Sequence, residues 1–233
     1  MRVEIWSDVV CPWCYVGKRR FEAALAAFPH RNDVEVVWRS FELDSEAPAE
    51  RIGDYAELLA AKYGLPVEQG AQMIDTMTAT AAAEGLDFRF DRARVGNTFD
   101  AHRLLHLAAQ HGRQDAVKER LMQASFTEGE PIGDRDALVR LVAEVGIDAD
   151  QAREVLESGR FAAEVRADQA QARAHGISGV PFFVVDGRYG VSGAQPVEAL
   201  SQVLATALAQ SRPPAMVAAE TGAPGCQDGS CAV

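Results

Sequence analysis

The pattern of hydrophobic and polar positions divides the chain into strand-like ends and a helical middle. At the start, Val3 and Ile5 alternate with the charged residues Arg2 and Glu4. An alternation with a period of two is typical of a half-buried strand. We therefore predict a first strand over residues 2–7.

A helix and a second strand are expected next. Phe21, Leu25 and Phe28 fall at i, i+4 and i+7, which places them on one apolar face of a helix. Pro12 suits the first turn of that helix, because an N–H group has no helical partner there. The run VEVVW at 34–38 predicts the second strand, so this part of the chain forms a βαβ unit.

Helical periodicity dominates between about Gly53 and His175. Glycines separate the periodic segments, as residues that end helices often do. The expected helices span 55–63, 67–84, 98–110, 116–126, 137–145 and 161–174. The short run LDFRF at 86–90 is the one strand-like exception. We therefore predict an all-helical insertion in this part of the chain.

Strand patterns return near the end of the sequence. The runs PFFVV at 181–185 and RYGV at 188–191 flank Asp186-Gly187, and an Asp-Gly step between apolar runs is a strong signal for a β-hairpin. A last helix is expected to begin at Gln195-Pro196. Its apolar face carries Val197, Leu200, Leu204 and Leu208.

These elements predict an α/β protein in which one domain is split by a large insertion. Residues 1–43 supply a βαβ unit and residues 176–210 supply a β-hairpin with a helix, and together they form the α/β domain. Residues 44–175 form the helical insertion domain. Prolines and glycines interrupt any periodicity over 211–233, which predicts a flexible C-terminal tail.

Composition narrows the classes of partner and location. The 233 residues carry a formal net charge of −11, which argues against nucleic acid as a partner because phosphate binding needs clustered Lys and Arg. The one basic cluster, Lys18-Arg19-Arg20, is short and suits a solvated helix face. No apolar run is long enough to span a bilayer, and the N-terminus lacks the apolar core of a signal peptide. We therefore expect a cytoplasmic protein with no membrane partner.

Two cysteines, Cys11 and Cys14, carry the strongest chemical signal. They stand at the start of the first predicted helix, where free N–H groups and a partial positive charge stabilise a thiolate. In C-x-x-C motifs placed in this way the thiol pKa falls to roughly 3.5–7.5. We expect Cys11 to be the nucleophile and Cys14 the resolving thiol that attacks a mixed disulfide on Cys11. Pro12 and Trp13 are expected to tune acidity and substrate fit.

Two other roles for the cysteines stay open. A structural disulfide between Cys11 and Cys14 would close almost no loop and would gain little stability. Zinc is the stronger alternative, because Cys226 and Cys231 bring the number of thiols to four, enough for a tetrahedral site. The first pair opens a helix and the second pair lies in the predicted tail, so we expect a site without metal.

The motifs together resemble a known family. The stretches SDVVCPWCYVGK at 7–18, FELD at 41–44, NTFDAHRLLHLA at 97–108 and SGVPFFV at 178–184 resemble the DsbA family of thioredoxin-fold oxidoreductases, and within it the FrnE-like branch. The resemblance covers nearly the whole chain. It implies a thioredoxin fold with a helical insertion. It also implies a relationship to 2-hydroxychromene-2-carboxylate isomerases and kappa-class glutathione transferases.

The resemblance implies roles for further residues. Val180-Pro181 matches the cis-proline loop that faces the cysteines in this fold, where the backbone of Val180 pairs with an extended substrate. From the residues alone, a trans proline that starts an edge strand fits equally well. The stretch Asn97–Arg103 is expected beside the cysteines. His102 and His106 have the i, i+4 spacing of metal ligands, although surface or core roles are commoner for such histidines.

Cys226 and Cys231 resemble a C-terminal C-x4-C pair of some FrnE-like proteins. We hypothesise that this second dithiol exchanges electrons with Cys11 and Cys14, or shields them. A coil between the last predicted helix and Cys226 would reach roughly 20 Å on average. Incidental exposed thiols and a metal-chelating tail are the alternatives.

Three functions agree with these residues. The leading one is a cytoplasmic thiol–disulfide oxidoreductase or isomerase that acts on disulfide-containing proteins or small thiols and needs no metal or organic cofactor. The alternative is a glutathione-dependent isomerase or transferase, in which Ser192-Gly193 holds a carboxylate of the co-substrate glutathione. The third is a redox-sensing or chaperone-like protein whose cleft binds partners. Related branches include dimers, so a homodimer built on the insertion stays open.

Overall fold

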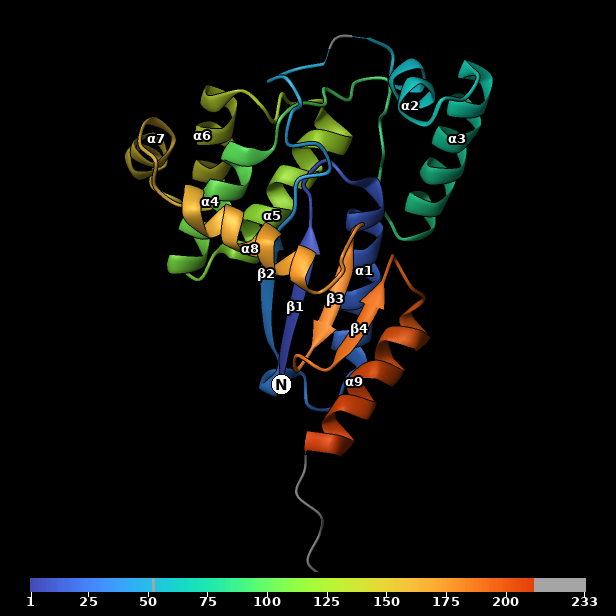
Figure 1. Ribbon diagram of the computed structural model, residues 1–233, viewed down its shortest axis with the longest axis vertical. Helices are drawn as coiled ribbons and strands as arrows, with labels where there is room; N and C mark the ends of the chain where they lie inside the picture. The colour runs from blue at the N-terminus through green and yellow to red at the C-terminus, as the bar shows by residue number, and fades with distance from the viewer. Residues whose placement is uncertain (52, 212–233) are drawn as a thin grey trace, which may run out of the picture.

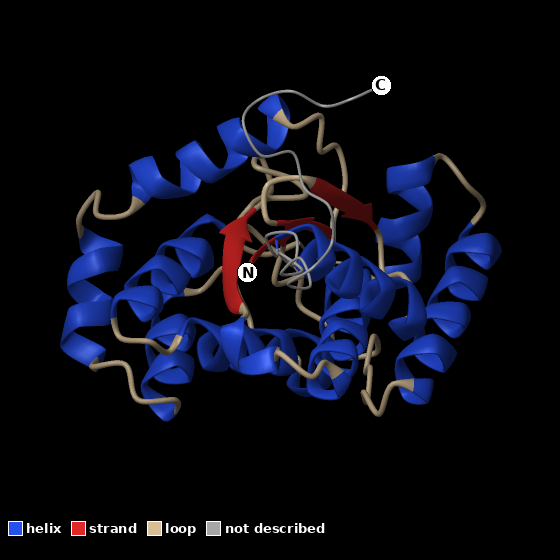
Figure 2. Ribbon diagram, turned by 90° about the horizontal axis from the view of Figure 1, so that it is seen from below, coloured by secondary structure: helices blue, strands red, loops and turns tan. Residues whose placement is uncertain are grey.

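The computed structural model describes residues 1–51 and 53–211, and these form one four-stranded sheet with helices around it (Figure 2). The strands are β1 (Arg2–Ser7), β2 (Glu35–Ser40), β3 (Phe182–Val185) and β4 (Tyr189–Ser192), in the spatial order β2-β1-β3-β4. β1 runs parallel to β2 and antiparallel to β3, and β3 runs antiparallel to β4.

The first and the last strands of the described chain, β1 with β2 and β3 with β4, meet in this one sheet (Figure 1). Helix α1 (Pro12–Ala27) links β1 to β2, and helix α9 (Val197–Ser211) follows the hairpin of β3 and β4. Val3 pairs with Val36 on one side and with Val185 on the other, so β1 joins the N-terminal βαβ unit to the C-terminal ββα unit. The predicted thioredoxin arrangement with a helical insertion is confirmed.

One face of the sheet is covered by α1 and α9. Ile5 and Phe183 point from the strands into a core that they share with Phe21 of α1 and Leu204 of α9. Alternation along each strand produces this arrangement, because successive side chains point to opposite faces. Burying an apolar side chain of this size contributes about 1.5–3 kcal/mol, so this face anchors both helices.

The other face of the sheet is covered by α8 (Ala162–Ala174). Trp6 of β1 packs there with Ala172 and Val184, and its indole N–H donates to the carbonyl of Asp168 at 3.0 Å. Helix α8 therefore completes a layer of the sheet although it lies within the predicted insertion. The domain boundary between 175 and 176 stays a prediction.

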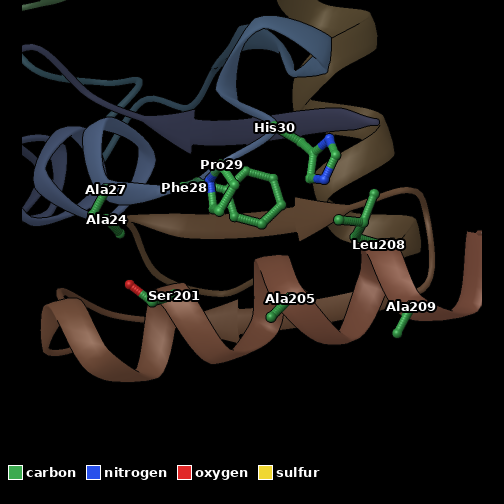
Figure 3. Close-up of a pocket in the computed structure, with 9 residues that line it drawn as sticks. All are labelled: Ala24, Ala27, Phe28, Pro29, His30, Ser201, Ala205, Leu208 and Ala209. Carbon is green, nitrogen blue, oxygen red and sulfur yellow. The ribbon is translucent and has the colours of Figure 1, made fainter.

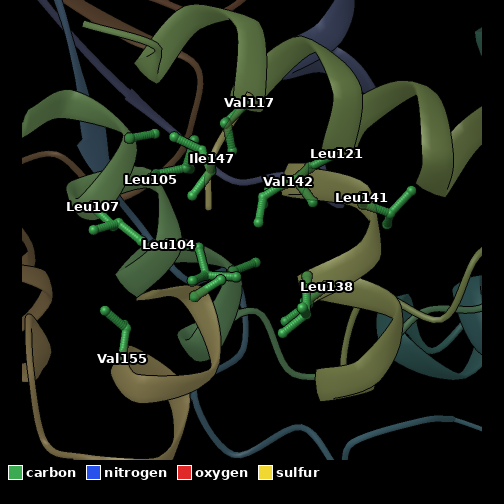
Figure 4. Packing of buried hydrophobic residues seen from close by; sticks show 14 of the residues in the cluster. Leu104, Leu105, Leu107, Val117, Leu121, Leu138, Leu141, Val142, Ile147 and Val155 are labelled. Carbon is green, nitrogen blue, oxygen red and sulfur yellow. The ribbon is translucent and has the colours of Figure 1, made fainter. Parts of the chain in front are cut away.

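The helical insertion has a core of its own. Its other helices are α2 (Tyr55–Tyr63), α3 (Val67–Ala83), α4 (Phe99–Gln110), α5 (Gln114–Gln123), α6 (Arg135–Glu144) and α7 (Ala149–Glu157). A π-helical segment η2 (Ala124–Glu128) continues α5, and a 3₁₀ turn η1 (Arg31–Asp33) precedes β2. Apolar side chains of α4 to α7 interlock (Figure 4). The fully buried members include Leu104, Leu107, Leu121, Leu138 and Val155.

The stretch LDFRF at 86–90 is not a strand, contrary to its sequence pattern. Its backbone makes one hydrogen bond of the strand kind, from Arg89 N–H to the carbonyl of Phe126 at 2.7 Å, and no strand of the described residues lies beside it. Phe88 and Phe90 are buried among other aromatic rings. The alternation therefore reflects packing of an extended loop, and not pairing in a sheet.

Helix α7 was not expected from the sequence. Asp148 caps its N-terminus by accepting hydrogen bonds from the N–H groups of Asp150 and Gln151 at 3.1 and 2.9 Å. Ala152 and Val155 are buried on one face of the helix. The cap and this spacing were the signals that could have identified the helix.

Candidate active site

Cys11 and Cys14 lie where the loop after β1 becomes helix α1. Cys11 directly precedes the helix, with an extended backbone (φ −96°, ψ 111°), and Pro12 occupies the first turn as predicted. The N–H groups of Cys14 and Tyr15 both approach the Cys11 carbonyl, at 3.0 and 3.3 Å. The turn thus holds two thiols, 3% and 0% exposed, at the partly positive end of the helix.

The loop before β3 faces these thiols. The Val180-Pro181 peptide bond is cis, as the resemblance implied. The Cys11 Sγ atom lies 3.6 Å from the Val180 carbonyl oxygen, within hydrogen-bonding distance for a thiol. Gly17 of α1 touches the same loop, because a Cβ atom there would lie only 2.8 Å from Pro181 Cγ. Helix α1 therefore sets how the Val180-Pro181 loop lies against Cys11.

The residues predicted to contact substrate differ in exposure. Trp13, between the two cysteines, is 40% exposed, which is unusual for so large an apolar ring. Pro12 and Val180 are half-buried. Contact of these three residues with a substrate stays a prediction.

Aromatic residues of the insertion pack in one cluster with the two cysteines. Phe88 stacks on Phe126 with ring centroids 4.8 Å apart, and Tyr55 packs on Phe90 at 4.7 Å. All of these belong to one buried or half-buried cluster with the two cysteines. Sequence reasoning missed the cluster, although the alternation of LDFRF was a signal that Phe88 and Phe90 are buried.

Asp8 is a buried carboxylate in the loop just before the cysteines. One carboxyl oxygen accepts from the Val9 N–H at 2.8 Å and lies 3.2 Å from Nε2 of His102, and the other accepts from the Leu43 N–H at 2.8 Å. Burial by itself would raise the pKa of Asp8, but the hydrogen bond and charge of His102 lower it below the ordinary value of 3.8. Asp8 thus joins the loop before Cys11 to α4 and to the segment after β2.

The two histidines of α4 have protein partners. His102 is bonded to Asp8, and His106 Nε2 lies 3.1 Å from the Ser40 hydroxyl and 3.2 Å from a carboxyl oxygen of Asp168. Within residues 1–51 and 53–211, no group of three or more His, Cys, Asp or Glu side chains could hold a metal ion. Of the stretch Asn97–Arg103, His102 reaches Asp8 in the loop that leads to the cysteines, and a place for the stretch beside the cysteines themselves stays a prediction.

A lysine of the insertion lies behind Cys14. Lys118 of α5 is 0% exposed, and its ammonium group donates to the carbonyl of Ser7, the last residue of β1, at 3.1 Å. Helix α5 is held there by Gln114, whose side-chain amide donates to the Trp38 carbonyl and accepts from the Trp38 N–H, as a neighbouring strand would. A single lysine in a helical period carries no signal, so sequence reasoning missed it.

The two thiols titrate as a pair, and the structure differs here from the expected low pKa of Cys11. The hydrogen bond with Cys14 and burial raise the pKa of Cys11 well above its ordinary value. Burial by itself would raise the pKa of Cys14, but the hydrogen bond from Cys11 and the charge of Lys118 lower it. The two thiols are therefore coupled in their titration, and the charge of Lys118 favours the thiolate form of Cys14.

Two predictions concern residues away from the first cysteine pair, the tail cysteines and Ser192-Gly193. Cys226 and Cys231 lie outside the described residues, so the tail dithiol and the four-thiol zinc site stay predictions. The Gly193 N–H donates to the Pro181 carbonyl at 2.8 Å, and the Ser192 carbonyl accepts from the Gln195 side chain at 2.8 Å. The Gly193 amide expected to hold a glutathione carboxylate is thus already engaged.

A cavity of about 470 Å³ lies at the other end of α1 (Figure 3). Its lining comes from the end of α1 with the residues after it and from α9: Ala24, Ala27, Phe28, Pro29, His30, Ser201, Ala205, Leu208 and Ala209. Helix α1 has 16 residues, so the cavity is separated from Cys11 by roughly 24 Å of helix. The cavity is not part of the cysteine site.

Comparison with known proteins agrees with this geometry. The family model described as "DSBA-like thioredoxin domain" matches residues 2–205. The crystal structure of a probable DsbA oxidoreductase from Streptomyces coelicolor is 47% identical, with a TM-score of 0.87 over 100% of this chain and 99% of that one. The uncharacterized protein YwbO of Bacillus subtilis is 29% identical over an alignment of 194 residues, and the match covers 79% of this chain and 86% of YwbO. A 2-hydroxychromene-2-carboxylate isomerase shares the fold at 14% identity, with a TM-score of 0.65 over 90% of this chain and 97% of that one.

Proposed function

This chain belongs to the DSBA-like thioredoxin domain family, and from that premise we propose that it is a thiol–disulfide oxidoreductase with Cys11 and Cys14 as its working dithiol. One observation carries the proposal. Two buried thiols lie together at the N-terminal end of α1, and the Cys11 sulfur lies 3.6 Å from the backbone carbonyl oxygen of Val180 in the cis-proline loop. The motifs around both cysteines favour the FrnE-like branch of the family.

The chemistry is two successive thiol–disulfide exchanges. Once Cys11 has lost its proton, its thiolate attacks one sulfur of a substrate disulfide, forms a mixed disulfide and releases the other substrate sulfur as a thiolate. Cys14, once deprotonated, attacks the Cys11 sulfur and releases the remaining substrate thiolate. The substrate gains two electrons and the Cys11–Cys14 pair becomes a disulfide. Run in reverse, the same steps oxidise a substrate dithiol.

Substrates of this reaction are disulfide-containing proteins or small thiols. An extended substrate segment would pair with the backbone of Val180 while its apolar side chains contact Pro12 and Trp13. The exchange needs no metal or organic cofactor, and glutathione would enter as a co-substrate. A homodimer through the insertion stays a proposal, and sedimentation of the full chain would test it.

We place the protein in the cytoplasm, where a close cysteine pair of this kind acts in catalysis. None of the helices within residues 1–51 and 53–211 is long and apolar enough to cross a bilayer. The acidic net charge of −11 makes nucleic acid an unfavourable partner. Fractionation of cells that express a tagged full chain would test the location.

The first test is thiol trapping with mass mapping after equilibration in graded glutathione buffers. We expect a Cys11–Cys14 disulfide with a midpoint between roughly −120 and −270 mV, the range of working oxidoreductases. Cys11→Ser should abolish turnover of a disulfide substrate, and Cys14→Ser should accumulate the mixed disulfide on Cys11. If no Cys11–Cys14 disulfide forms at any poise, the proposed function is wrong. Tightly bound, non-covalent glutathione would then favour the isomerase or transferase, and reversible oxidation without turnover would favour a redox sensor.

We further propose that Cys226 and Cys231 exchange electrons with the first dithiol. The spacing of two thiols after the last helix supports this relay. Replacing both residues by serine should slow turnover with a disulfide substrate and should remove mixed Cys11–Cys226 or Cys11–Cys231 species from the mass map. Unchanged turnover and an unchanged disulfide pattern would rule the relay out.

A further inference from the structure

Lys118 of α5 is buried against the end of β1. Its ammonium group is 0% exposed and makes its recorded hydrogen bond to the carbonyl of Ser7 at 3.1 Å. Across residues 1–51 and 53–211, no salt bridge joins Lys118 to an Asp or Glu side chain. An ammonium group has three protons to donate, and an unpaired charge in the interior is costly. The side chain therefore needs an anion that its surroundings can supply.

The groups that face Lys118 identify that anion. The charged or titratable side chains that act on it are Cys14 and Cys11 at the start of α1, Asp8 in the loop after β1, and Lys18 on α1. Lys18 carries the same charge and repels it. Asp8 is already held by the imidazole of His102 and by two backbone N–H groups.

The Cys14 thiol is the remaining candidate. It is 0% exposed, so solvent cannot neutralise a charge on it. The hydroxyl of Ser7 is buried and makes no hydrogen bond to a group other than Cys14 among the described residues, and its interaction with Cys14 lowers the pKa of that thiol. The ammonium group of Lys118, which is bonded to the Ser7 carbonyl, and the Ser7 hydroxyl would therefore both stabilise a negative charge on the Cys14 sulfur.

We propose that Lys118 is the counter-ion of the thiolate form of the Cys11–Cys14 pair and that it makes the disulfide easier to reduce. The inference rests on the proposed function, because it concerns the same dithiol. It assigns a role to the helical insertion, since α5 carries Lys118 to the back of the thioredoxin-like site. It also predicts that the protein tends to act as an oxidant of dithiols.

Reduction of the Cys11–Cys14 disulfide by glutathione consumes two glutathione thiols. Two glutathione thiols give two electrons to the Cys11–Cys14 disulfide, its S–S bond breaks and glutathione disulfide forms. One of the two glutathione protons stays on the cysteine pair, and the other is released to solvent. The remaining thiolate is neutralised by the ammonium group of Lys118. In the disulfide form the same ammonium group faces two uncharged sulfur atoms, so it stabilises the reduced form alone.

The titration of Lys118 agrees with this arrangement. Burial lowers the pKa of Lys118 to about 8 from its ordinary value of 10.5, while the charges of Cys14 and Asp8 act in the opposite direction. The ammonium group is therefore still present at neutral pH when the thiolate forms.

The test compares the full wild-type chain with Lys118→Met and with Lys18→Met as a matched control. Lys18 is equally buried but is paired with three carboxylates. After equilibration in graded glutathione buffers at pH 7, trapping with mass mapping gives the equilibrium constant for reduction of the Cys11–Cys14 disulfide. We expect at least a tenfold decrease in Lys118→Met, which corresponds to about 30 mV, and less than a twofold change in Lys18→Met.

Equal constants for the wild type and Lys118→Met would overturn the role of Lys118 and leave the dithiol function in place. The absence of a Cys11–Cys14 disulfide in the wild type would overturn the function itself. A second measurement needs no apolar variant: the ultraviolet absorption of thiolate in the reduced wild type, followed against pH. We expect thiolate below the ordinary thiol pKa of roughly 8.5, and an upward shift in Lys118→Gln. Thiolate that appears only above that value in the wild type would contradict the proposal.

Discussion

Two buried lysines lie against the same tryptophan and have opposite surroundings. The Nζ atoms of Lys18 and Lys118 are 5.9 and 5.6 Å from the centroid of the Trp38 ring. Both side chains are almost completely buried. The carboxylates that pair with Lys18 are Glu22, Asp115 and Glu119. Lys118 instead donates a hydrogen bond to the backbone carbonyl of Ser7 and interacts with the charges of the cysteine site.

The difference shows that the charged partners of a buried lysine, and not its burial alone, decide whether its pKa is raised or lowered. Burial by itself would lower the pKa of Lys18, but its three carboxylates raise it above the ordinary value of 10.5. Burial lowers the pKa of Lys118 to about 8, because no carboxylate pairs with it in the part of the chain that the structure describes. Lys18 is therefore an anchor between α1 and α5, whereas the charge of Lys118 depends on the state of the thiols.

The largest effect on the free energy of unfolding is expected from replacing Asp8, the buried carboxylate in the loop before the cysteines. Asp8→Asn removes the buried anion that pairs with His102, and the loss of one partner from a buried ionic pair costs about 3–5 kcal/mol. The matched change near Lys18, Asp115→Asn, should cost less than about 1 kcal/mol, because the Asp115 side chain is 63% exposed. Urea denaturation at pH 7 measures both.

The pH dependence of the Asp8 contribution provides its control. The folded pKa of Asp8 is below its ordinary value of 3.8, so its stabilisation is present above pH 3.8 and is lost as the pH falls through the folded pKa. The gap between the wild type and Asp8→Asn should therefore close in acid. A gap that stays constant down to pH 2 would show that the carboxylate charge does not matter.

The second effect is the response of the disulfide form to alkaline pH. Between about pH 8 and 10.5 the unfolded chain keeps a proton on Lys118 that the folded chain has lost, so wild-type stability should rise with pH through this group. A shift of this size corresponds to about 3 kcal/mol at most. In the disulfide form the rise should begin below pH 8, because the thiolate that raises the Lys118 pKa is absent.

Urea denaturation of the oxidised protein at several pH values measures this rise, and Lys118→Met should lack it. Lys18 should behave in the opposite way. Its raised folded pKa means that its stabilisation is complete below pH 10.5 and is lost at higher pH. Parallel curves for Lys118→Met and Lys18→Met would remove the distinction between the two lysines.

The third effect separates the two lysines at neutral pH. Lys18→Met should cost about 2 kcal/mol in both redox states, because it leaves Glu22 and Glu119 without their buried partner at a site that is partly solvated. Lys118→Met should cost nothing measurable in the disulfide form, since an apolar side chain replaces an unpaired cation, and should destabilise the reduced form alone. Denaturation of each variant with and without reductant tests this. Equal losses in both redox states for Lys118→Met would be the opposite result.

The smallest effect on stability is expected from Gly17→Ala, which changes the packing of the cysteine site and leaves its charges in place. Gly17→Ala leaves both lysines in place but presses a methyl group to within 2.8 Å of Pro181 Cγ. Overpacking of about 1–3 kcal/mol is partly offset by the gain of about 0.5–1 kcal/mol from replacing a helical glycine, so we expect a net loss of about 1 kcal/mol. Reaction with a disulfide substrate should slow because the Val180 backbone moves, whereas the equilibrium constant for reduction should stay within twofold. Unchanged kinetics would show that the loop position is not critical.

Much of the fold was predictable because local patterns and the sheet agree. The alternation around Val3, the Asp186-Gly187 turn and the apolar face of α9 each specify an element that needs no distant partner to be identified. LDFRF failed because alternation also arises when an extended loop packs against a core. Helix α7 was missed because its apolar face is only a few residues long.

The candidate site was predictable in part. The C-x-x-C spacing at the start of a helix identified Cys11 and Cys14, and the resemblance identified the Val180-Pro181 loop. Asp8 and His102 lie in motifs that the resemblance contained, but the sequence does not show that they touch at 3.2 Å. Their contact spans 94 residues, and the packing of α4 under the loop after β1 produces it.

The sequence by itself determined the α/β thioredoxin arrangement and the presence of a dithiol, because both depend on patterns within short segments. Only the tertiary structure decided the directions in which the pKa values of the two thiols shift, because these depend on groups from separate elements. Lys118 lies 104 positions after Cys14 in the sequence, and the docking of α5 against β2 brings its cation behind the thiol. Electrostatic interactions in a buried site act over a few ångströms of space, which a linear sequence does not record.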